Sequence, residues 1–225
     1  SAGANPPTEM GAATRLAMRL SSLGRAARSK AGIKVRQGGF QVGENGVEPL
    51  RLGVQAAAWA GMPVMVHIAN GVPVDEVLSL LRSGDIVTHC YQGTGDGVVD
   101  DSGAVVDEVW AARERGVLFD VGHGGGSFDY GVAISALADG FVADVISTDL
   151  HASSWDSPIE SMPETASKLL NLGVSLERVV HQSTTAAAGA IGRTDELGTL
   201  RVGTVADLAA FEMLQGAFEF ADVRG

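Results

Sequence analysis

Two short apolar runs, Pro63-Val-Met-Val-His67 and Asp85-Ile-Val-Thr-His89, each end in a histidine. Two more runs of the same kind are Gly32-Ile-Lys-Val-Arg36 and Val145-Ile-Ser-Thr-Asp149. Runs of this length that are rich in Val and Ile are typical of buried β-strands. Helical stretches separate them, and the alternation predicts a parallel sheet. In a parallel barrel, residues at the carboxyl ends of the strands converge on one mouth, where the chemistry takes place.

A fifth apolar run covers residues 117–121, which makes five strand–helix units in series. Helices are expected over residues 48–60, 73–81, 105–115, 130–138, 161–171 and 184–191, with one more helical pattern over residues 8–30. We therefore predict the C-terminal five strand–helix units of an α/β fold, the (β/α)8 TIM barrel. An open doubly wound sheet uses the same units and remains the alternative.

The pattern changes near residue 196. Leu197 to Phe211 reads as short alternating β-like segments instead of strand–helix units. We therefore assign residues 1–195 to the partial barrel and residues 196–225 to a separate C-terminal segment.

Composition narrows the class of protein. The 225 residues are 45% hydrophobic and 19% charged, as in ordinary globular proteins. The net charge of -11 argues against nucleic acid or an anionic membrane as a partner. Gly61 and Pro63 interrupt the most apolar stretch, so no membrane span is expected. The single cysteine, Cys90, excludes an internal disulfide and fits a reducing compartment, so we expect a cytoplasmic protein.

The residues that end the runs can bind a metal ion. His67 and His89 offer imidazole nitrogens to Zn²⁺ or a similar ion, and Asp149 adds a carboxylate oxygen. Each of them alone could instead be a hydrogen-bonded loop residue or a helix cap. Their ordered placement at successive strand ends predicts a metal site.

Lys34 is the unusual member of this series. Its amine, with an ordinary pKa of about 10.4, is protonated at neutral pH and repels a cation. It becomes a ligand only after it loses that proton and reacts with carbon dioxide to form an anionic carbamate. The alternative is a lysine that forms a salt bridge.

The series of lysine, two histidines and aspartate resembles the binuclear branch of the amidohydrolase superfamily. Five phrases are similar to its amidohydrolase/deacetylase group, whose members are often labelled dihydroorotase-like: Gly32-Ile-Lys-Val-Arg36, Val66-His-Ile-Ala-Asn70, Thr88-His-Cys90, Phe119-Asp-Val-Gly-His-Gly124 and Ile146-Ser-Thr-Asp-Leu-His151. The resemblance covers about residues 32–225. It implies that residues 196–225 are return strands of a small β-sandwich.

The resemblance also implies roles. A carbamylated Lys34 would bridge two divalent ions, most simply zinc, while His67 and His89 bind the second ion and Asp149 binds the first. Asp149 would also be the general base, which takes a proton from water and passes it to the leaving group. The residues by themselves agree with this, because they combine an acid–base group with Lewis-acid ligands and need no protein nucleophile.

Other residues are candidates for substrate contacts. The Gly122-His-Gly-Gly-Gly126 loop could present His123 and the backbone of Gly124 to the substrate, or be a plain turn. His151 is expected in the mouth, and Arg36 could pair with a substrate carboxylate or with a surface acid. Cys90 follows His89 and is expected to be a buried thiol, and His181 is expected to be structural. Esterase, phosphate-loop and HExxH signatures are incomplete or absent.

One ligand set of the family is missing from the sequence. Its first barrel strand ends in His-x-His, whereas the five histidines here are His67, His89, His123, His151 and His181. We therefore expect about 100 or more residues upstream of Ser1, with three strand–helix units of about 30 residues each. The first of those strands should end in His-x-His.

The sequence thus predicts a metal-dependent hydrolase that cleaves an amide or ester of a small carboxylated substrate, such as an N-acyl or O-acyl acid. A cyclic amidase of the dihydroorotase kind is the alternative enzyme. A non-catalytic barrel fragment that serves in assembly is the alternative of another class, favoured by the missing His-x-His. The expected partner is a small-molecule substrate, and a homo-oligomer is left open.

Overall fold

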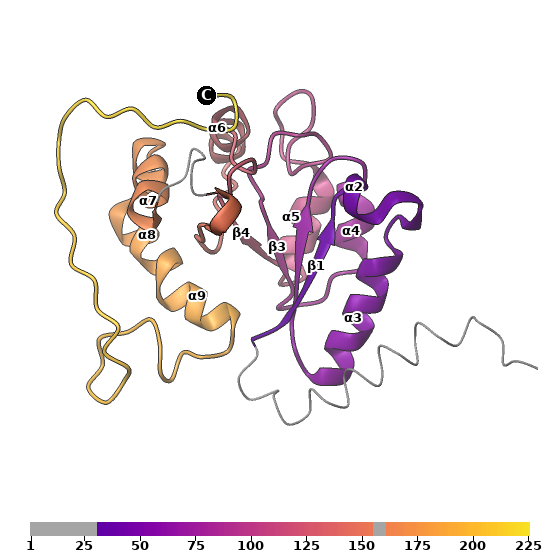
Figure 1. Cartoon of the computed structure of the whole chain (residues 1–225), viewed down its shortest axis with the longest axis horizontal. Helices are drawn as coiled ribbons and strands as arrows, with labels where there is room; N and C mark the ends of the chain where they lie inside the picture. Colours follow the sequence, from indigo (N-terminus) through magenta and orange to yellow (C-terminus); the bar gives the residue numbers. More distant parts are fainter. Residues whose placement is uncertain (1–30, 155–160) are drawn as a thin grey trace, which may run out of the picture.

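A parallel sheet forms the centre of the computed structural model, which describes residues 31–154 and 161–225. Its strands stand side by side in chain order (Figure 1): β1 (Ile33–Gln37), β2 (Val64–Ile68), β3 (Ile86–Thr88) and β4 (Leu118–Asp120). These strands confirm four of the five predicted runs. The helix expected over residues 8–30 lies outside the described residues.

The fifth run lies beside the end of β4 without becoming a regular strand. Val145 forms an isolated parallel bridge with Asp120. The Val145 amide donates to Phe119 O at 3.1 Å, and His123 further along donates to Ser147 O at 3.0 Å. The backbone from Val145 to Asp149 therefore continues the parallel arrangement and carries Asp149 to the same end of the sheet.

Helices follow the strands largely as predicted. Those named in the prediction are α3 (Glu48–Ala60), α4 (Val74–Ser79), α5 (Asp107–Glu114), α6 (Tyr130–Ala138), α7 (Met162–Asn171) and α9 (Thr185–Ala190). The chain also forms α8 (Leu176–Ser183) and the short turns α2 (Gly39–Val42), η3 (Gly43–Asn45) and η4 (Ala152–Ser154), which the sequence did not indicate. Ser161 caps α7 by accepting a hydrogen bond from the Glu164 amide, as its capping sequence predicts.

The two faces of the sheet have different surroundings. Helices α3, α4 and α5 cover one face (Figure 1), where Val35 packs so closely that a Cβ at Gly53 would lie 2.5 Å from it. The strand register places Arg36, His67, Thr88 and Asp120 in one row across the sheet. Because side chains alternate between faces, this row points away from α3. The row lies at the carboxyl ends of the strands.

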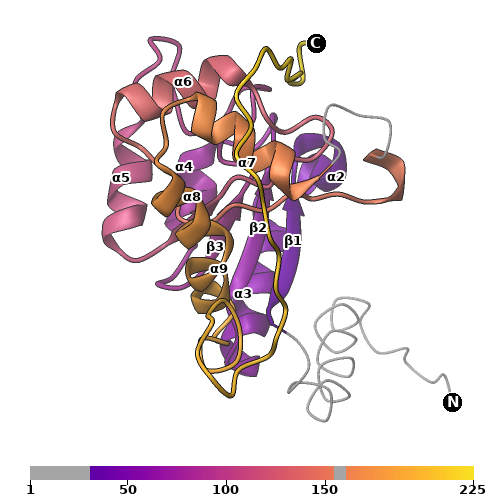
Figure 2. The same cartoon turned by 90° about the vertical axis from the view of Figure 1, so that its left-hand side faces the viewer.

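Helices α7, α8 and α9 lie on the side of β4 away from β1 (Figure 1) and face the viewer in Figure 2. Helix α8 touches the run after Val145, because the Ile146 amide donates to Gln182 O at 3.3 Å. None of the described helices has the length and apolar character that a membrane span requires.

Residues 197–225 contain neither helix nor strand in the structure. The return strands expected there are therefore not formed, since a strand needs a neighbouring strand and the described residues offer this segment none. The segment runs along the outside of the molecule (Figure 1) and ends beside α6, where the Val223 amide donates to Phe128 O at 3.1 Å. Its assignment to a second domain stays a prediction.

Candidate metal centre

His67 and His89 meet at the carboxyl ends of β2 and β3. Their ring centroids are 4.4 Å apart, and the rings lie edge to face at 79°. His67 faces this side because it belongs to the row that points away from α3. The structure thus brings together the two histidines that the sequence selected.

His89 reaches this face through an unusual backbone. Thr88 already points to the row of His67, so regular alternation would turn His89 to the opposite face. Instead, His89 has a φ of 69°, in the left-handed region that non-glycine residues seldom adopt. Strained backbone of this kind collects at functional sites, where the surrounding structure enforces it.

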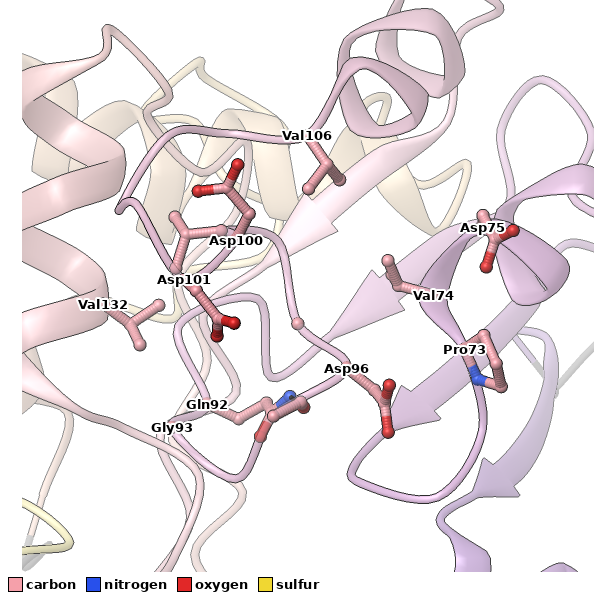
Figure 3. A pocket seen from close by; sticks show the side chains of 13 residues that line it. Pro73, Val74, Asp75, Gln92, Gly93, Asp96, Asp100, Asp101, Val106 and Val132 are labelled. Carbon is pink, nitrogen blue, oxygen red and sulfur yellow. Dashed lines mark hydrogen bonds between the residues drawn. The ribbon is translucent and has the colours of Figure 1, made fainter.

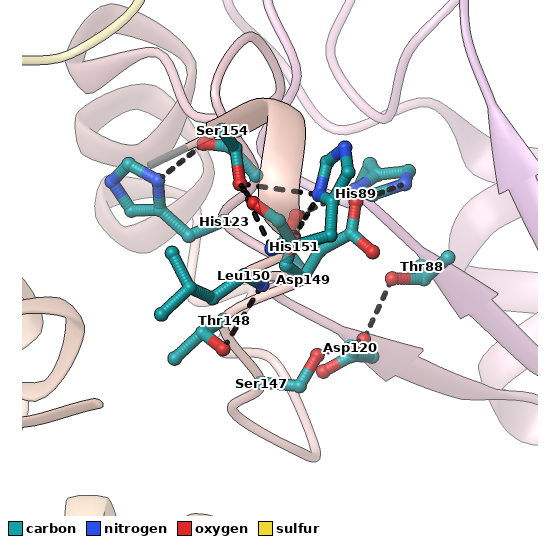
Figure 4. A network of polar contacts seen from close by, with 12 residues as sticks. Thr88, His89, Asp120, His123, Ser147, Thr148, Asp149, Leu150, His151 and Ser154 are labelled. Carbon is teal, nitrogen blue, oxygen red and sulfur yellow. Dashed lines mark hydrogen bonds and ion pairs between the residues drawn. The ribbon is translucent and has the colours of Figure 1, made fainter. Parts of the chain in front are cut away.

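The hydrogen bond of His89 suits a metal ligand. Its Nδ1 lies 2.5 Å from the carbonyl oxygen of Gly122, an acceptor, so Nδ1 carries the proton. The lone pair is then on Nε2, which lies 3.9 Å from Oδ2 of Asp149 (Figure 4). Histidine ligands usually donate their other ring N–H to an acceptor of this kind, which fixes both tautomer and orientation.

Asp149 also has a left-handed backbone, with a φ of 47°. Two atoms bound to one zinc ion lie no further apart than about 4.2 Å, the sum of two bond lengths. The 3.9 Å between His89 Nε2 and Asp149 Oδ2 is within this span. The Asp149 side chain is 49% exposed, so it is open to water and substrate.

Protonation in the centre favours metal binding. Burial is the main cause that lowers the pKa of His67 to about 4; the neighbouring His89, Arg36 and Lys34 act in the same direction, and Asp149 opposes them. The pKa of His89 is also lowered, chiefly by burial. Both imidazoles are therefore neutral at pH 7, the form that binds a cation.

Lys34 lies on the same face, on the edge strand β1. Solvent reaches much of its side chain, but burial around the amine still lowers its pKa, while the charges of Asp149 and Asp120 raise it. A lowered pKa increases the fraction of neutral amine, which is the form that reacts with carbon dioxide.

The donors fit a divalent ion in type, namely two neutral imidazoles and a carboxylate. Across residues 31–154 and 161–225, however, no three His, Cys, Asp or Glu side chains are close enough together to form a complete metal site. The contacts are pairwise, between His67 and His89 and between His89 and Asp149.

Asp120 is a polar residue of this face that sequence reasoning passed over. It is buried, and its Oδ2 accepts hydrogen bonds from Thr88 Oγ1 at 2.6 Å and Ser147 Oγ at 2.7 Å (Figure 4). Its Oδ1 has no partner among the described residues. Burial raises the pKa of Asp120, against the hydrogen bonds and the charge of Lys34. Its place near the end of the apolar run over residues 117–121, comparable to that of His67 in its own run, is the sequence signal that would have found it.

His123 is buried behind the centre. Its ring stacks on Phe128 at 4.7 Å, and its Nδ1 lies 2.8 Å from Gly124 O. Lys168 donates a hydrogen bond to its Nε2 at 2.9 Å. Burial lowers the pKa of His123 to about 4, and the charge of Lys168 acts in the same direction. Both ring nitrogens are thus engaged inside the protein, and substrate contact by this ring stays a prediction.

The remaining candidates are distributed around the centre. Gly124 lies against Asp149, because a Cβ there would be 3.3 Å from Asp149 Oδ2. His151 is exposed, and its Nδ1 lies 2.7 Å from Asp149 O. Arg36 is exposed beside His67 in the register. Cys90 is fully buried, as expected.

A hollow of about 420 Å³ is lined by the loop after β3 and by Pro73 (Figure 3). Two of its carboxylates bind the loops themselves: Asp96 accepts from the Gly71 amide at 2.7 Å, and Asp100 accepts from Ser102. Gln92 binds Thr94 and Gly95 across the same loop. The hollow contains none of the metal candidates, so it does not define the site.

The chain is similar to several known proteins. A family model described as amidohydrolase family matches residues 131–223. A deacetylase of Enterococcus faecalis is 37% identical over 184 residues, which cover 80% of this chain and 50% of that protein. A deacetylase of Agrobacterium fabrum is 37% identical over 200 residues, which cover 86% of this chain and 48% of that protein. The chain thus spans about half the length of the curated relatives it matches.

Solved structures show the same relationship. A structure titled an adenine deaminase has a TM-score of 0.88 at 32% identity, and the match covers 93% of this chain and 58% of that one. A structure titled a dihydroorotase has a TM-score of 0.82 at 36% identity, and the match covers 93% of this chain and 56% of that one. These matches confirm the predicted fold class, a segment of a parallel α/β barrel.

Proposed function

Because the chain is a member of the amidohydrolase superfamily, we propose that its protein is a deacylase that hydrolyses an amide or ester bond. The proposed substrate is a small carboxylated molecule such as an N-acyl amino acid or an acetylated hydroxy acid. The curated relatives named deacetylases support the acyl group as the part that is removed.

The proposed metal residues are Lys34 as its carbamate, His67, His89 and Asp149. A bound zinc or similar ion would lower the pKa of water and polarise the scissile carbonyl. Two features of the protein favour binding of this ion: both imidazoles are neutral, and a hydrogen bond to Gly122 O fixes the His89 ring. The same ring orientation leaves Nε2 facing Asp149.

Asp149 is the proposed general base. Its carboxylate is half exposed, so it can accept a proton from the attacking water and later return it to the leaving nitrogen or oxygen. Its neighbour His89 is neutral and fully buried, so it does not compete for the proton at pH 7.

Substrate contacts are proposed for the groups at the rim. Arg36 is exposed on the same face as His67 and offers a cation to a substrate carboxylate. His151 and the backbone at Gly124 flank Asp149. His123 supports the loop that carries Gly124.

One observation carries the proposal: His89 Nδ1 is committed to Gly122 O while its Nε2 lies 3.9 Å from Asp149 Oδ2. To test it, the full-length protein should be assayed for bound metal and for hydrolysis of N-acyl amino acids and acetylated hydroxy acids. Metal binding with turnover of an acyl substrate would support the proposal. A metal-free protein without turnover would refute it and favour the non-catalytic fragment.

A cyclic amidase of the dihydroorotase type is the second candidate, supported by the likeness to the structure titled a dihydroorotase. The two candidates require the same centre and differ in the substrate. Dihydroorotate, and adenine in view of the other structural match, therefore belong in the same screen. Turnover of a cyclic amide with no turnover of acyl compounds would decide for the second candidate.

A further inference from the structure

We infer that Lys168 is a positioning residue of the proposed centre: through His123 it fixes the loop Gly122–Gly124, which orients His89 and packs against Asp149. The inference rests on the proposed function, which assigns His89 and Asp149 their roles as metal ligands. Its physical content, a buried lysine that holds one loop in place, stands on contacts between described residues of the protein.

Lys168 is a charged residue with no access to water. It lies in the middle of α7, and its side chain is fully buried. Its Nζ lies 2.9 Å from His123 Nε2, 2.9 Å from Glu164 Oε1 and 2.7 Å from Ala221 O. A buried ammonium group is costly unless acceptors surround it, so this arrangement favours one fixed geometry for His123, Glu164 and Ala221 around the amine.

His123 passes this constraint to its loop. Because Lys168 donates to Nε2, the proton of the neutral ring is on Nδ1, which donates to Gly124 O at 2.8 Å. The ring is clamped in addition by stacking on Phe128. The His123 side chain therefore holds the backbone of its own loop from within the protein.

The loop in turn holds the proposed ligands. Gly122 O accepts the Nδ1 proton of His89, and Gly124 lies against the Asp149 carboxylate. The amides of His123 and Gly124 donate to Ser147 O at 3.0 Å and Thr148 O at 2.8 Å, which binds the loop to the run that ends in Asp149. A shift of this loop would move the acceptor of His89 and the neighbour of Asp149 together.

The C-terminal end of the chain completes the arrangement. Ala221 O is one of the acceptors that the described residues offer to Lys168, and Asp222 accepts from the Tyr130 amide at 2.8 Å. Arg224 pairs with Asp129, and Val223 bonds Phe128 O, so the segment Ala221–Arg224 closes over the residues that follow the loop. These contacts join residues that are about 50 to 100 positions apart in the sequence, and they surround the buried amine of Lys168.

The decisive variant replaces Lys168→Met together with Glu164→Gln. It removes the charge without leaving the glutamate unpaired, so the protein keeps its fold more readily than with Lys168→Met alone. The matched control is Arg82→Met, which breaks the ion pair with Asp85 at the opposite ends of the strands. A further variant, Asp222→Ala, releases the C-terminal segment and leaves Lys168 in place.

Two measurements on the full chain separate positioning from general stability. In the metal-free protein, hydrogen exchange of the His123 and Gly124 amides should become at least about tenfold faster in the double variant. The dissociation constant for Zn²⁺ should rise about tenfold, as for other residues that support a ligand from behind. Asp222→Ala should move both quantities in the same direction by a smaller factor. Arg82→Met should lower the melting temperature and leave both unchanged.

Wild-type exchange at His123 and Gly124 in the folded double variant would overturn the inference, as would equal changes in the Arg82→Met control. Failure of the proposed function looks different. In that case the substrate screen shows no turnover, while the exchange of the loop amides still responds to Lys168.

Discussion

At the residue scale, Asp149 combines a strained backbone with an accessible carboxylate. A non-glycine residue at a φ of 47° is uncommon, and aspartate tolerates that region better than most because its short side chain can bond locally. Asparagine shares this tolerance. Replacement of Asp149 by asparagine therefore removes the proposed base while it preserves the backbone.

We expect Asp149→Asn to lower turnover by at least about 10². Bound metal should fall less, because the amide keeps an oxygen near the centre. Turnover of an acyl substrate and metal content by atomic spectroscopy measure the two effects. Wild-type turnover in this variant would remove Asp149 from the mechanism.

Replacement of Lys34 tests whether its carbamate is a metal ligand. Lys34→Ala should lose metal and activity, and added short-chain carboxylates should restore part of both, because they can occupy the place of the carbamate. Arg36→Ala is the comparison on the same strand, since its loss should weaken substrate binding without any response to carboxylates. A metal-loaded crystal structure with an unmodified Lys34 amine would contradict the expectation.

Gly122 is a third test at this scale. Its φ is 50°, and a Cβ there would lie 2.1 Å from Thr88 Oγ1 and 3.0 Å from His89 Nδ1. We expect Gly122→Ala to lower the free energy of unfolding by about 1–2 kcal/mol from the backbone alone, and by more from the overlap. It should also weaken Zn²⁺ binding, because the acceptor of His89 moves.

Gly126→Ala is the matched control for this substitution. It lies in the same loop, but a Cβ there would have nothing within 4 Å. Chemical denaturation and zinc titration of both variants make the comparison. Equal effects of the two substitutions would show that the site near His89 has more room than the structure implies.

At the element scale, sequence patterns located the strands and most helices, because a strand or helix depends mainly on residues that are close together in the sequence. The run ending in His67 became β2, and the stop at Gly61 ends α3 with a φ of 64°. The left-handed turn at His89, the register of Asp120 and the burial of Lys168 were not predictable in this way. Lys168 reads locally as an exposed helix residue, and its burial follows from partners 45 and 53 residues away.

The ion pair of Arg82 with Asp85 fixes the start of β3 against β2. Asp85 accepts from the Val64 amide and from Arg82 Nη2 at 2.7 Å. Burial alone would raise the pKa of Asp85, but these hydrogen bonds outweigh it and hold the pKa below the usual value. We expect Asp85→Asn to lower the free energy of unfolding by about 1.5–3 kcal/mol at pH 7.

The pH dependence of this effect has a definite sign. A depressed carboxyl pKa stabilises the fold above the unfolded value of about 3.9, and that contribution disappears as the pH falls through the folded pKa. The difference between wild type and Asp85→Asn in urea unfolding should therefore narrow below about pH 4. Glu48→Gln, which breaks an exposed pair with Arg51, is the control and should have little effect at either pH. A difference that is constant with pH would contradict the assignment.

At the scale of the whole molecule, the barrel segment was predictable but the C-terminal segment was not. Four of the five runs became strands, and the fifth kept its place beside β4. Leu197 to Phe211 has the alternation of strands, yet alternation specifies only which residues share a face and supplies no pairing partner. The segment therefore lies extended on the surface, with apolar side chains in water.

These side chains predict how the chain behaves when produced alone. Val202 is fully exposed, Leu200 is 84% exposed, and Leu208 and Phe211 are each 70% exposed. Exposed apolar side chains gathered in one segment promote association between copies of the chain. We expect the 225-residue chain to self-associate in light scattering and the fourfold serine variant of these positions to do so less. The melting temperature should stay the same, and a wild-type chain that is monomeric at high concentration would refute the expectation.

The left-handed backbone of His89 also has an evolutionary consequence. Glycine would relieve the backbone strain at this position, and this relief would offset part of the cost of removing a buried imidazole that donates to Gly122 O. In a lineage released from selection for activity, folding would therefore protect this histidine less than it protects a buried residue with an unstrained backbone. Its persistence or decay across a sampled set of descendants would serve as a record of whether the chemistry was still in use.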